Sequence, residues 1–321
     1  MSKPTVLMTA GLMPMIQDQL EESFDVHRLD QVPDQDALIA EIGDNVIGVC
    51  HGGHAMHVDA ALMDRLPSMQ LVSNFGVGYD GVNAAHAASR NVIATNTPDV
   101  LNDDVANMAV TLVLTCSRRF SEWERFARAG RWEKEGDPPL ARAINGRKVG
   151  ILGLGRIGKD IARKLEVFGC VIGYHGRSQQ ADQTYAFYDD LSDMARDCDF
   201  LIAICPGGDA TRGIVNAQVL EALGPQGTFI NVARGSVHDE DALIDALATG
   251  KLGHAGLDVF AAEPKIPEKL RVLDNVTLQP HQGSATVETR RAMGDLVANN
   301  LLNFFDGKGP ITPVAECADI R

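Results

Sequence analysis

Short apolar runs alternate with amphipathic segments along the first hundred residues. A continuous apolar run bounded by polar residues or glycine is typical of a parallel strand that is covered on both faces. The segments between the runs have the spacing of helices that bury one face. This alternation predicts a small α/β domain with a parallel sheet. The predicted strands are Val6–Met8, Val46–Cys50, Leu71–Phe75 and Val92–Asn96, and the predicted helices are Pro14–Phe24 and Asp59–Leu66.

The same alternation resumes in the middle of the chain. Long amphipathic helices are predicted on either side of it, at Asn102–Phe120 and Thr286–Phe305, and a polar loop at 130–142. Apolar runs that alternate with helices are typical of a second parallel sheet. The predicted strands are Lys148–Leu152, Val171–Tyr174, Phe200–Ile204, Thr228–Val232, Ala255–Val259 and Val276–Leu278.

The last long helix determines the predicted domain boundaries. We expect it to return to the first domain, which then comprises residues 1–101 and 286–321, while residues 102–285 form the second domain. The predicted fold is α/β, with two Rossmann-like, doubly wound parallel-sheet domains, the first discontinuous and flavodoxin-like. A chain of 321 residues that is 45% hydrophobic is long and apolar enough for two such cores.

Charge and cysteine content restrict the partners. The formal net charge is -14, so the chain is a poor candidate for binding nucleic acid or an anionic membrane surface. The chain contains six cysteines but no C-x-x-C pair, and most of the six lie in apolar runs. We interpret them as buried free thiols rather than disulfides or metal ligands. With neither a signal peptide nor a membrane span expected, we predict a cytoplasmic protein with a small-molecule partner.

The stretch Lys148–Gly158 carries a dinucleotide-binding fingerprint in its required context. An apolar strand leads into Gly153-x-Gly155-x-x-Gly158, and a helical pattern follows. The first glycine permits a tight turn, the second a close approach of the pyrophosphate, and the third close packing of helix on strand. The helix N-terminus favours an anion. The predicted cofactor contacts here are Gly153, Leu154, Gly155, Arg156, Ile157 and Gly158.

The end of the next predicted strand bears on the choice between NAD(H) and NADP(H). An acidic residue about twenty positions after the fingerprint would bind the ribose 2′-hydroxyl of NAD. Here His175 stands in that place, and Arg177 and Ser178 follow. An arginine offers a bidentate fork to a 2′-phosphate, and a serine offers a hydroxyl. We therefore predict NADP(H); the alternative is that Arg177 only stacks on the adenine, with weak selectivity.

Three ionisable side chains follow strand ends in the second domain. Arg234, Glu263 and His281 come after successive predicted strands. Ligands bind outside the carboxyl ends of parallel strands, so we expect the three side chains to converge there. Taken alone, each would more often be a solvated surface residue. Three groups of complementary type behind a dinucleotide fingerprint instead indicate a catalytic set.

The chemistry of this set suits reduction of a 2-keto acid. Arg234 can bind the substrate carboxylate and carbonyl oxygens with its planar fork. His281 can donate a proton to the carbonyl oxygen as hydride arrives. Glu263 can bind the other imidazole nitrogen, set the tautomer and stabilise the imidazolium. Asp258 is predicted to orient the nicotinamide end of the cofactor.

Several stretches resemble one known family. The chain is similar to the D-isomer-specific 2-hydroxyacid dehydrogenases, and within them to the glyoxylate/hydroxypyruvate and hydroxyphenylpyruvate reductases. The likeness covers nearly the whole chain and is highly specific. The matching stretches are Asn74–Asp80, Thr95–Leu101, Val149–Gly158, Asn231–Gly235, Gly256–Phe260 with Glu263-Pro264, and Pro280–Ser284.

The resemblance implies further contacts and an assembly. It implies that backbone N–H groups near Val77 and Gly78 hold the substrate carboxylate, and that a loop at Gly52 and Gly53 closes from the other side. It also implies an NADPH-favouring enzyme and a homodimer paired through the nucleotide-binding domains. For that arrangement our hypothesis is that the loop carrying Trp132 reaches the active site of the neighbouring subunit. The remaining predicted cofactor contacts are Cys205, Pro206, Val232, Ala233 and Gly283.

Alternatives remain open for the substrate, the activity and one histidine cluster. The substrate is predicted to be glyoxylate or hydroxypyruvate, and the alternative is a bulkier aryl-pyruvate. A second alternative is a non-catalytic, nicotinamide-sensing module that resembles transcriptional corepressors. His51, His54 and His57 recur at every third residue. A metal site is one interpretation, but no cysteine or carboxylate lies at ligand spacing from these histidines. We therefore interpret His51 or His54 as lining the substrate mouth or capping the next helix.

Overall fold

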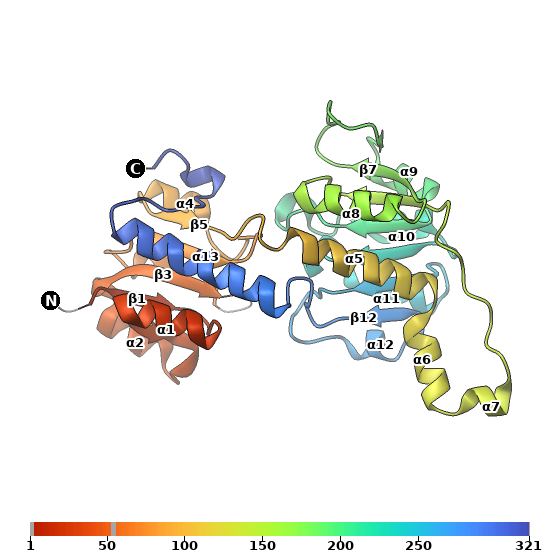
Figure 1. Cartoon of the computed structure of the whole chain (residues 1–321), viewed down its shortest axis with the longest axis horizontal. Coiled ribbons are helices and arrows are strands. Elements are labelled where there is room, and N and C mark those ends of the chain that lie inside the picture. The colour runs from red at the N-terminus through yellow and green to blue at the C-terminus, as the bar shows by residue number, and fades with distance from the viewer. Residues whose placement is uncertain (1–2, 53–55, 321) are drawn as a thin grey trace. The chain divides into compact units, whose positions relative to one another are not determined.

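The computed structural model describes residues 3–52 and 56–320. The chain folds into two compact units. The first unit comprises residues 1–101 and 286–321, and the second comprises residues 102–285 (Figure 1). Both chain termini therefore belong to the first unit, because the last long helix packs there.

The first unit is built on a parallel sheet. Within the described residues its five strands lie in the order β2-β1-β3-β4-β5. This is the order of the flavodoxin-like doubly wound fold. The strands are β1 (Thr5–Met8), β2 (Asp25–Arg28), β3 (Val46–Gly52), β4 (Leu71–Phe75) and β5 (Ile93–Thr95).

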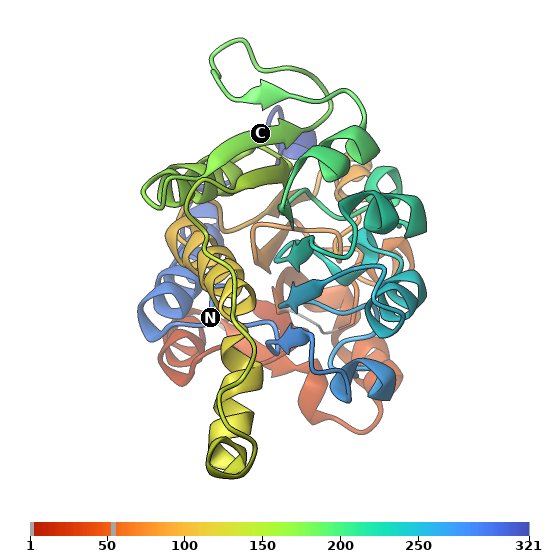
Figure 2. The same cartoon turned by 90° about the vertical axis from the view of Figure 1, so that its right-hand side faces the viewer.

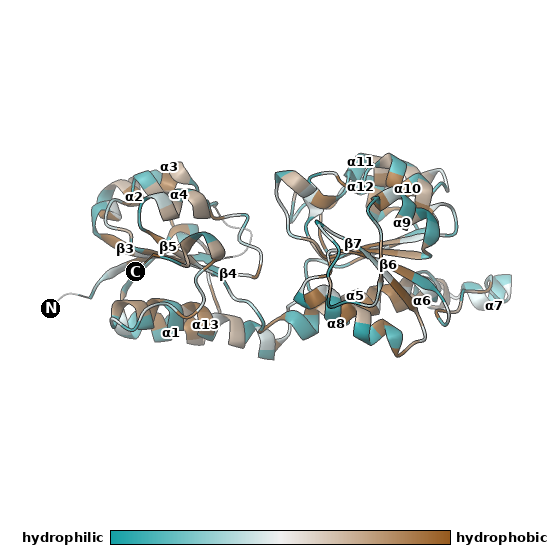
Figure 3. Cartoon of the chain, turned by 90° about the horizontal axis from the view of Figure 1, so that it is seen from above, coloured by the Kyte–Doolittle hydropathy of each residue, from teal (hydrophilic) through white to brown (hydrophobic). Residues whose placement is uncertain are grey.

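Helices cover both faces of this sheet. The helices α1 (Pro14–Ser23) and α13 (Val287–Phe305) lie on one face, and α2 (Gln35–Ile42), α3 (Ala60–Asp64) and α4 (Ala84–Ser89) on the other (Figure 3). Short 3₁₀ turns complete the unit at η1 (Leu29–Gln31), η2 (Gly43–Asn45) and η5 (Ala315–Cys317).

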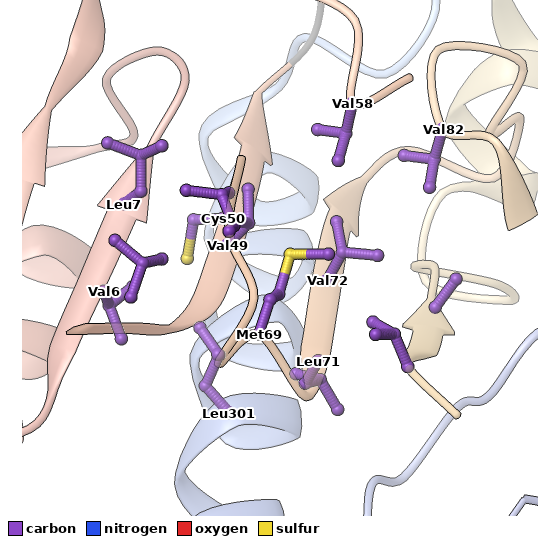
Figure 4. Packing of buried hydrophobic residues seen from close by; sticks show 14 of the residues in the cluster. Val6, Leu7, Val49, Cys50, Val58, Met69, Leu71, Val72, Val82 and Leu301 are labelled. Carbon is purple, nitrogen blue, oxygen red and sulfur yellow. The ribbon is translucent and has the colours of Figure 1, made fainter. Parts of the chain in front are cut away.

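The core of the first unit explains why its two sequence segments belong together. Val49 of β3, Val72 of β4 and Leu301 of α13 belong to one buried cluster, which α13 joins from the C-terminal segment (Figure 4). All three side chains are fully buried. A Cβ atom at Gly48 would lie 2.8 Å from the Leu301 side chain. A larger residue at that position would require the Leu301 side chain to shift.

The second unit has a seven-stranded parallel sheet in the described part of the chain. The strand order is β12-β11-β10-β9-β6-β7-β8. After β6, the chain adds strands first on the β7 side and then, from β9 on, on the other side. Ligands bind beside such a switch point, at the carboxyl ends of the strands. The strands are β6 (Lys148–Leu152), β7 (Val171–His175), β8 (Ala186–Phe187), β9 (Phe200–Ala203), β10 (Thr228–Asn231), β11 (His254–Leu257) and β12 (Val276–Leu278).

Helices again lie on both faces. The helices α5 (Asn102–Ser117) and α8 (Arg156–Glu166) cover one face (Figure 3). The other face carries α9 (Leu191–Asp197), α10 (Ala217–Leu223), α11 (Glu240–Ala248) and α12 (Glu268–Arg271). The 3₁₀ turns are η3 (Asp209–Thr211) and η4 (Gly235–Val237).

The structure corrects the predicted course of the chain after residue 117. The helix expected at Asn102–Phe120 ends at Ser117, because Arg119 adopts a left-handed backbone conformation with φ of 50°. Its guanidinium pairs with Glu122 and lies 4.4 Å from the Trp123 ring. A new helix, α6 (Phe120–Arg128), follows. The predicted loop at 130–142 begins instead with helix α7 (Arg131–Glu135), and both helices extend away from the sheet (Figure 2).

Two strands were not predicted. The first is β2, a polar Asp-Val-His-Arg segment at the sheet edge, paired with β1 on one side. The second is β8, which has two residues and pairs with β7 at the edge of the sheet in the second unit. β2 lacks the continuous apolar pattern that identified the other strands, and β8 is too short to show one. None of the helices in the described ranges combines the length and apolar character that crossing a membrane requires.

Candidate active site

The sheet order brings three of the predicted residues to one edge of the second unit. Arg234 follows β10, Asp258 follows β11, and His281 follows β12. These strands are immediate neighbours in the order β12-β11-β10. Because all are parallel, their carboxyl ends lie side by side. Arg234, Asp258 and His281 therefore follow the ends of three adjacent strands.

Glu263 and His281 form a direct pair. Glu263 Oε2 lies 2.7 Å from His281 Nδ1. The other oxygen, Oε1, accepts a hydrogen bond from the Phe260 N–H at 2.9 Å. A carboxylate only accepts hydrogen bonds, so Nδ1 carries the proton of this contact. The Glu263 side chain is 14% exposed and the His281 side chain 29% exposed, and the pair leaves Nε2 on the side of the ring opposite the carboxylate.

Asp258 fixes the backbone that carries His281. The His281 N–H donates to the Asp258 carbonyl oxygen at 2.9 Å. The Asp258 carboxylate accepts the N–H groups of Gln282 and Gly283, at 2.6 Å and 2.8 Å. Burial raises the pKa of Asp258, and these two N–H donors oppose the rise. Together the contacts hold the backbone of His281 in a left-handed conformation, with φ of 54°, that residues other than glycine rarely adopt.

The turn that carries Arg234 packs on the loop that carries Glu263. Asn231 Oδ1 accepts the Ala233 N–H, and Asn231 Nδ2 donates to the Arg234 carbonyl oxygen, both at 2.9 Å. A Cβ atom at Gly235 would lie 1.9 Å from the Phe260 carbonyl oxygen. Only glycine fits there, so the Arg234 turn contacts the residue whose N–H holds the Glu263 carboxylate.

The glycine fingerprint has the geometry that a pyrophosphate requires. Gly153 has φ of 103°, and a Cβ atom there would lie 2.8 Å from the Cys205 backbone. At Gly158 a Cβ atom would lie 2.3 Å from the Gly153 carbonyl oxygen. At Gly155, the residue before α8, it would meet nothing within 4 Å. The turn is therefore tight where protein packs on protein and open at the helix N-terminus, where an anion is favoured.

The end of β7 is connected to this turn. His175 Nδ1 lies 2.8 Å from the Tyr188 carbonyl oxygen, which leaves Nε2 for another partner. Gln180 Nε2 donates to the Leu154 carbonyl oxygen at 2.8 Å. Arg177 and Ser178, which lie between His175 and Gln180 in the sequence, are exposed. Among the described residues no carboxylate forms an ion pair with Arg177.

The nearest acid on that loop is already paired. Asp182 Oδ2 lies 3.2 Å from Lys159 Nζ of α8. Hydrogen bonds from Gln183 and Lys159 lower the pKa of Asp182. Its charge is therefore offset locally, so the segment 175–178 presents a cation, a hydroxyl and an imidazole without an accompanying free carboxylate.

The remaining predicted cofactor contacts lie at neighbouring strand ends. Cys205 follows β9, and Val232 and Ala233 follow β10; these three side chains are nearly buried. Pro206 adjoins Cys205, and Gly283 is held by Asp258. The six cysteines are free thiols, as predicted.

In the first unit, side-chain amides hold the loop that follows β4. Asn74 Nδ2 donates to the Gly76 and Gly78 carbonyl oxygens, at 3.0 Å and 3.1 Å. Asn96 Nδ2 donates to the Val77 carbonyl oxygen at 2.9 Å. Three successive carbonyl groups are thus fixed, which fixes the peptide planes and the N–H groups of Val77 and Gly78.

Sequence reasoning missed the roles of Asn74 and Asn96, although both lie inside stretches that resemble the family. Gly52, at the end of β3, donates its N–H to Thr9 Oγ1 at 3.0 Å. Gly53 and His54 lie outside the described residues, so the predictions for them remain predictions.

The structure corrects the interpretation of His51. It is a strand residue of β3, only 2% exposed, with Nδ1 3.1 Å from Thr9 Oγ1. Burial lowers its pKa to about 4, so it is neutral at physiological pH and attracts no anion by charge. It caps no helix either, because Asp59 accepts the Leu62 N–H at the start of α3. His57 is exposed.

Comparison with known proteins gives consistent results. Residues 110–283 match the family model described as D-isomer specific 2-hydroxyacid dehydrogenase, NAD binding domain. The chain is 43% identical to a glyoxylate/hydroxypyruvate reductase A of Arabidopsis thaliana and 43% identical to a hydroxyphenylpyruvate reductase of Plectranthus scutellarioides. Each alignment covers 96% of this chain and 98% of the relative.

A solved structure extends the comparison. The NADPH-dependent glyoxylate/hydroxypyruvate reductase of Sinorhizobium meliloti, in complex with NADP and malonate, is similar to this chain with a TM-score of 0.91 and 44% identity. The match covers 100% of this chain and 99% of that one. The likeness therefore spans both units rather than the nucleotide-binding unit alone.

Proposed function

The chain belongs to the D-isomer-specific 2-hydroxyacid dehydrogenase family, and we propose that it reduces a small 2-keto acid to the D-2-hydroxy acid with NADPH. Glyoxylate and hydroxypyruvate are the proposed substrates. The observation that carries the proposal is the contact of 2.7 Å between Glu263 and His281, at a strand end beside that of Arg234. It joins a proton donor, its carboxylate partner and a cation suited to a keto acid.

A nicotinamide dinucleotide suits the fingerprint residues. The open space at Gly155, at the N-terminus of α8, supports a pyrophosphate there, held by backbone N–H groups between Gly153 and Gly158. When bound, the reduced cofactor supplies the hydride that attacks the carbonyl carbon. Asp258 and Gly283 are proposed to lie at its nicotinamide end.

The catalytic roles follow from the hydrogen bonds. Arg234 holds the substrate carboxylate and carbonyl oxygens and polarises the carbonyl group. His281 donates the Nε2 proton to the carbonyl oxygen, so that C=O becomes CH–OH. Glu263, fixed through the Phe260 N–H, holds the imidazolium before transfer and orients the ring afterwards. The substrate carboxylate is further bound by the N–H groups of Val77 and Gly78, with Gly52 and Gly53 in the adjoining loop.

NADPH is proposed over NADH because of the residues after β7. Arg177 and Ser178 are exposed, and His175 has one ring nitrogen left for a ligand. The NADPH dependence of the Sinorhizobium relative supports this choice. If it is right, Arg177→Ala raises KM for NADPH by about tenfold or more, the cost of a charge-assisted contact, and leaves KM for NADH unchanged. Equal effects on both cofactors would contradict it.

A second candidate substrate is an aryl-pyruvate. The hydroxyphenylpyruvate reductase relative is as similar to this chain as the glyoxylate/hydroxypyruvate reductase is. Measuring kcat/KM for glyoxylate, hydroxypyruvate and 4-hydroxyphenylpyruvate under the same conditions decides between the two classes. The proposal expects the two small acids to be preferred, and a preference for the aryl substrate would replace it.

We further propose a homodimer, as is implied by the family resemblance, with Trp132 of one subunit near the substrate of the other. Trp132 lies on α7, is 63% exposed, and donates its Nε1–H to Asp137 at 2.8 Å. A large, oriented and exposed indole on a helix that extends away from its own sheet is consistent with such a contact.

A further inference from the structure

A buried histidine lies behind the Arg234 turn and has no role in the proposed reaction. His238 follows η4 and is only 4% exposed. Its ring packs edge-on against Phe229 of β10, with 5.8 Å between the ring centroids. Within the described part of the chain, its side chain makes one hydrogen-bond contact, which joins Nδ1 to Asn231 Nδ2 at 2.9 Å. Asn231 is the residue whose amide holds the turn of Arg234.

The backbone fixes which way the Asn231 amide points. Its oxygen faces the Ala233 N–H, which can only donate, and its nitrogen faces the Arg234 carbonyl oxygen, which can only accept. Exchanging the two amide atoms would lose both bonds. One hydrogen of Nδ2 is therefore used by Arg234, and the second faces His238.

This orientation fixes the tautomer of His238. Because Asn231 donates the second hydrogen, Nδ1 of His238 must be the unprotonated acceptor, and the ring proton must be on Nε2. Nε2 is buried and has no hydrogen-bond partner among the described residues. Burial also lowers the pKa of His238 to about 4, so the ring stays neutral at physiological pH.

We propose that His238 is a positioning residue for substrate binding, acting on Arg234 through Asn231. The inference rests on the proposed function only in taking Arg234 as the substrate-binding arginine. His238 supplies the acceptor that completes the amide of Asn231, and the completed amide holds the Ala233 N–H and the Arg234 carbonyl in one conformation. Loss of that acceptor leaves a buried N–H unpaired and lets the amide rotate, which displaces the Arg234 fork.

Two substitutions separate this role from simple packing. His238→Phe keeps an aromatic ring against Phe229 but removes the acceptor. His238→Asn loses the ring but offers an oxygen close to the position of Nδ1. We expect His238→Phe to raise KM for hydroxypyruvate on the order of tenfold, the effect of one buried hydrogen bond, with KM for NADPH unchanged. His238→Asn is expected to restore most of the loss in KM.

A matched control is available in the same unit. His254, at the amino end of β11, also has a buried and unpartnered Nε2, and burial lowers its pKa too, but it does not contact Asn231. His254→Phe should leave KM for hydroxypyruvate unchanged. The proposal is overturned if His238→Phe has the wild-type KM, or if His238→Asn is as impaired as His238→Phe.

The tautomer tests the inference without any activity. Nitrogen-15 spectra of the histidine-labelled wild-type protein, with His238 assigned by its loss in His238→Asn, should show an unprotonated Nδ1 and a protonated Nε2. The opposite tautomer would overturn the proposal. If the wild-type protein reduces no 2-keto acid, the proposed function fails, whereas these spectra still decide whether His238 accepts from Asn231.

Discussion

Glu263 Oε2 lies 2.7 Å from His281 Nδ1, while Oε1 of the same carboxylate is held by the Phe260 N–H. The carboxylate therefore cannot follow the imidazole if the ring turns, and the imidazole cannot change tautomer without losing its partner. This relation leaves Nε2 as the site of proton exchange and explains why the two residues act as one unit in the proposed reaction.

The charge of Glu263 should matter more than its shape. Glu263→Gln keeps the size of the side chain but removes the negative charge that stabilises the imidazolium. We expect kcat for hydroxypyruvate to fall on the order of a hundredfold.

A second carboxylate, on helix α11, binds the same loop and provides the control. Glu240 Oε1 accepts the Ala261 N–H at 2.8 Å but has no histidine partner in the described structure. Glu240→Gln should leave kcat close to that of the wild type. A Glu263→Gln enzyme with the kcat of the wild type would show that the pair is structural.

The amides of Asn74 and Asn96 should control substrate affinity rather than cofactor affinity. Asn96→Ala frees the Val77 carbonyl, so the peptide N–H groups of the loop lose their fixed direction. We expect KM for the keto acid to rise by about tenfold, with KM for NADPH unchanged. Steady-state kinetics with each substrate varied in turn measures both.

Asn275→Ala is the matched control for that substitution. Its amide also donates to backbone carbonyls, those of Leu247 and Gly253, at 3.2 Å and 3.1 Å, but in the second unit. It should lower stability without altering either KM. If Asn275→Ala raises KM for the keto acid as much as Asn96→Ala does, the loop assignment is wrong.

Stability should depend on pH through two buried histidines. Burial holds the pKa values of His51 and His238 at about 4, below the ordinary value of 6.5. Between these pH values the unfolded chain binds more protons than the folded chain. The free energy of unfolding therefore rises with pH across this window and falls on acidification. The change is about 1.4 kcal/mol per pH unit for each histidine.

Denaturant unfolding at several pH values within the window tests this dependence. The slope should be smaller in His238→Asn, which no longer titrates at that position. An equal slope in wild type and His238→Asn would mean that His238 is not a source of the acid sensitivity.

Trp132 should affect the assembly or the substrate affinity. Trp132→Ala removes a large indole that is 63% exposed on α7. If the indole contacts a second copy, light scattering should show a weakened dimer, or KM for the keto acid should rise. Val272→Ala removes an apolar side chain that is 71% exposed elsewhere and should change neither. A Trp132→Ala protein with unchanged mass and KM would remove Trp132 from the proposal.

The central strands could be predicted because burial on both faces leaves a continuous apolar run, as in Phe200–Ala203. The edge strand β2 carries no such pattern, and its place in the sheet comes from its pairing with β1. The end of α5 is set by the left-handed backbone of Arg119, which no glycine or proline indicates in the sequence.

The same distinction holds in the site. The Glu263–His281 contact could be anticipated, because both residues follow neighbouring strand ends and have complementary chemistry. The amide of Asn231 could not, since its orientation depends on backbone groups and on a histidine seven residues later. The burial of His51 could not be anticipated either, because it depends on β3 extending through this residue into the core.

The most direct test of the proposed function is the initial rate of nucleotide oxidation with hydroxypyruvate, measured with NADPH and with NADH at equal concentrations. The account predicts turnover to the D-hydroxy acid, with kcat/KM for NADPH at least about tenfold above that for NADH. Equal rates would contradict the role of Arg177 and Ser178. No oxidation of either nucleotide, with glyoxylate and aryl-pyruvates also tried, would contradict the proposed reaction itself.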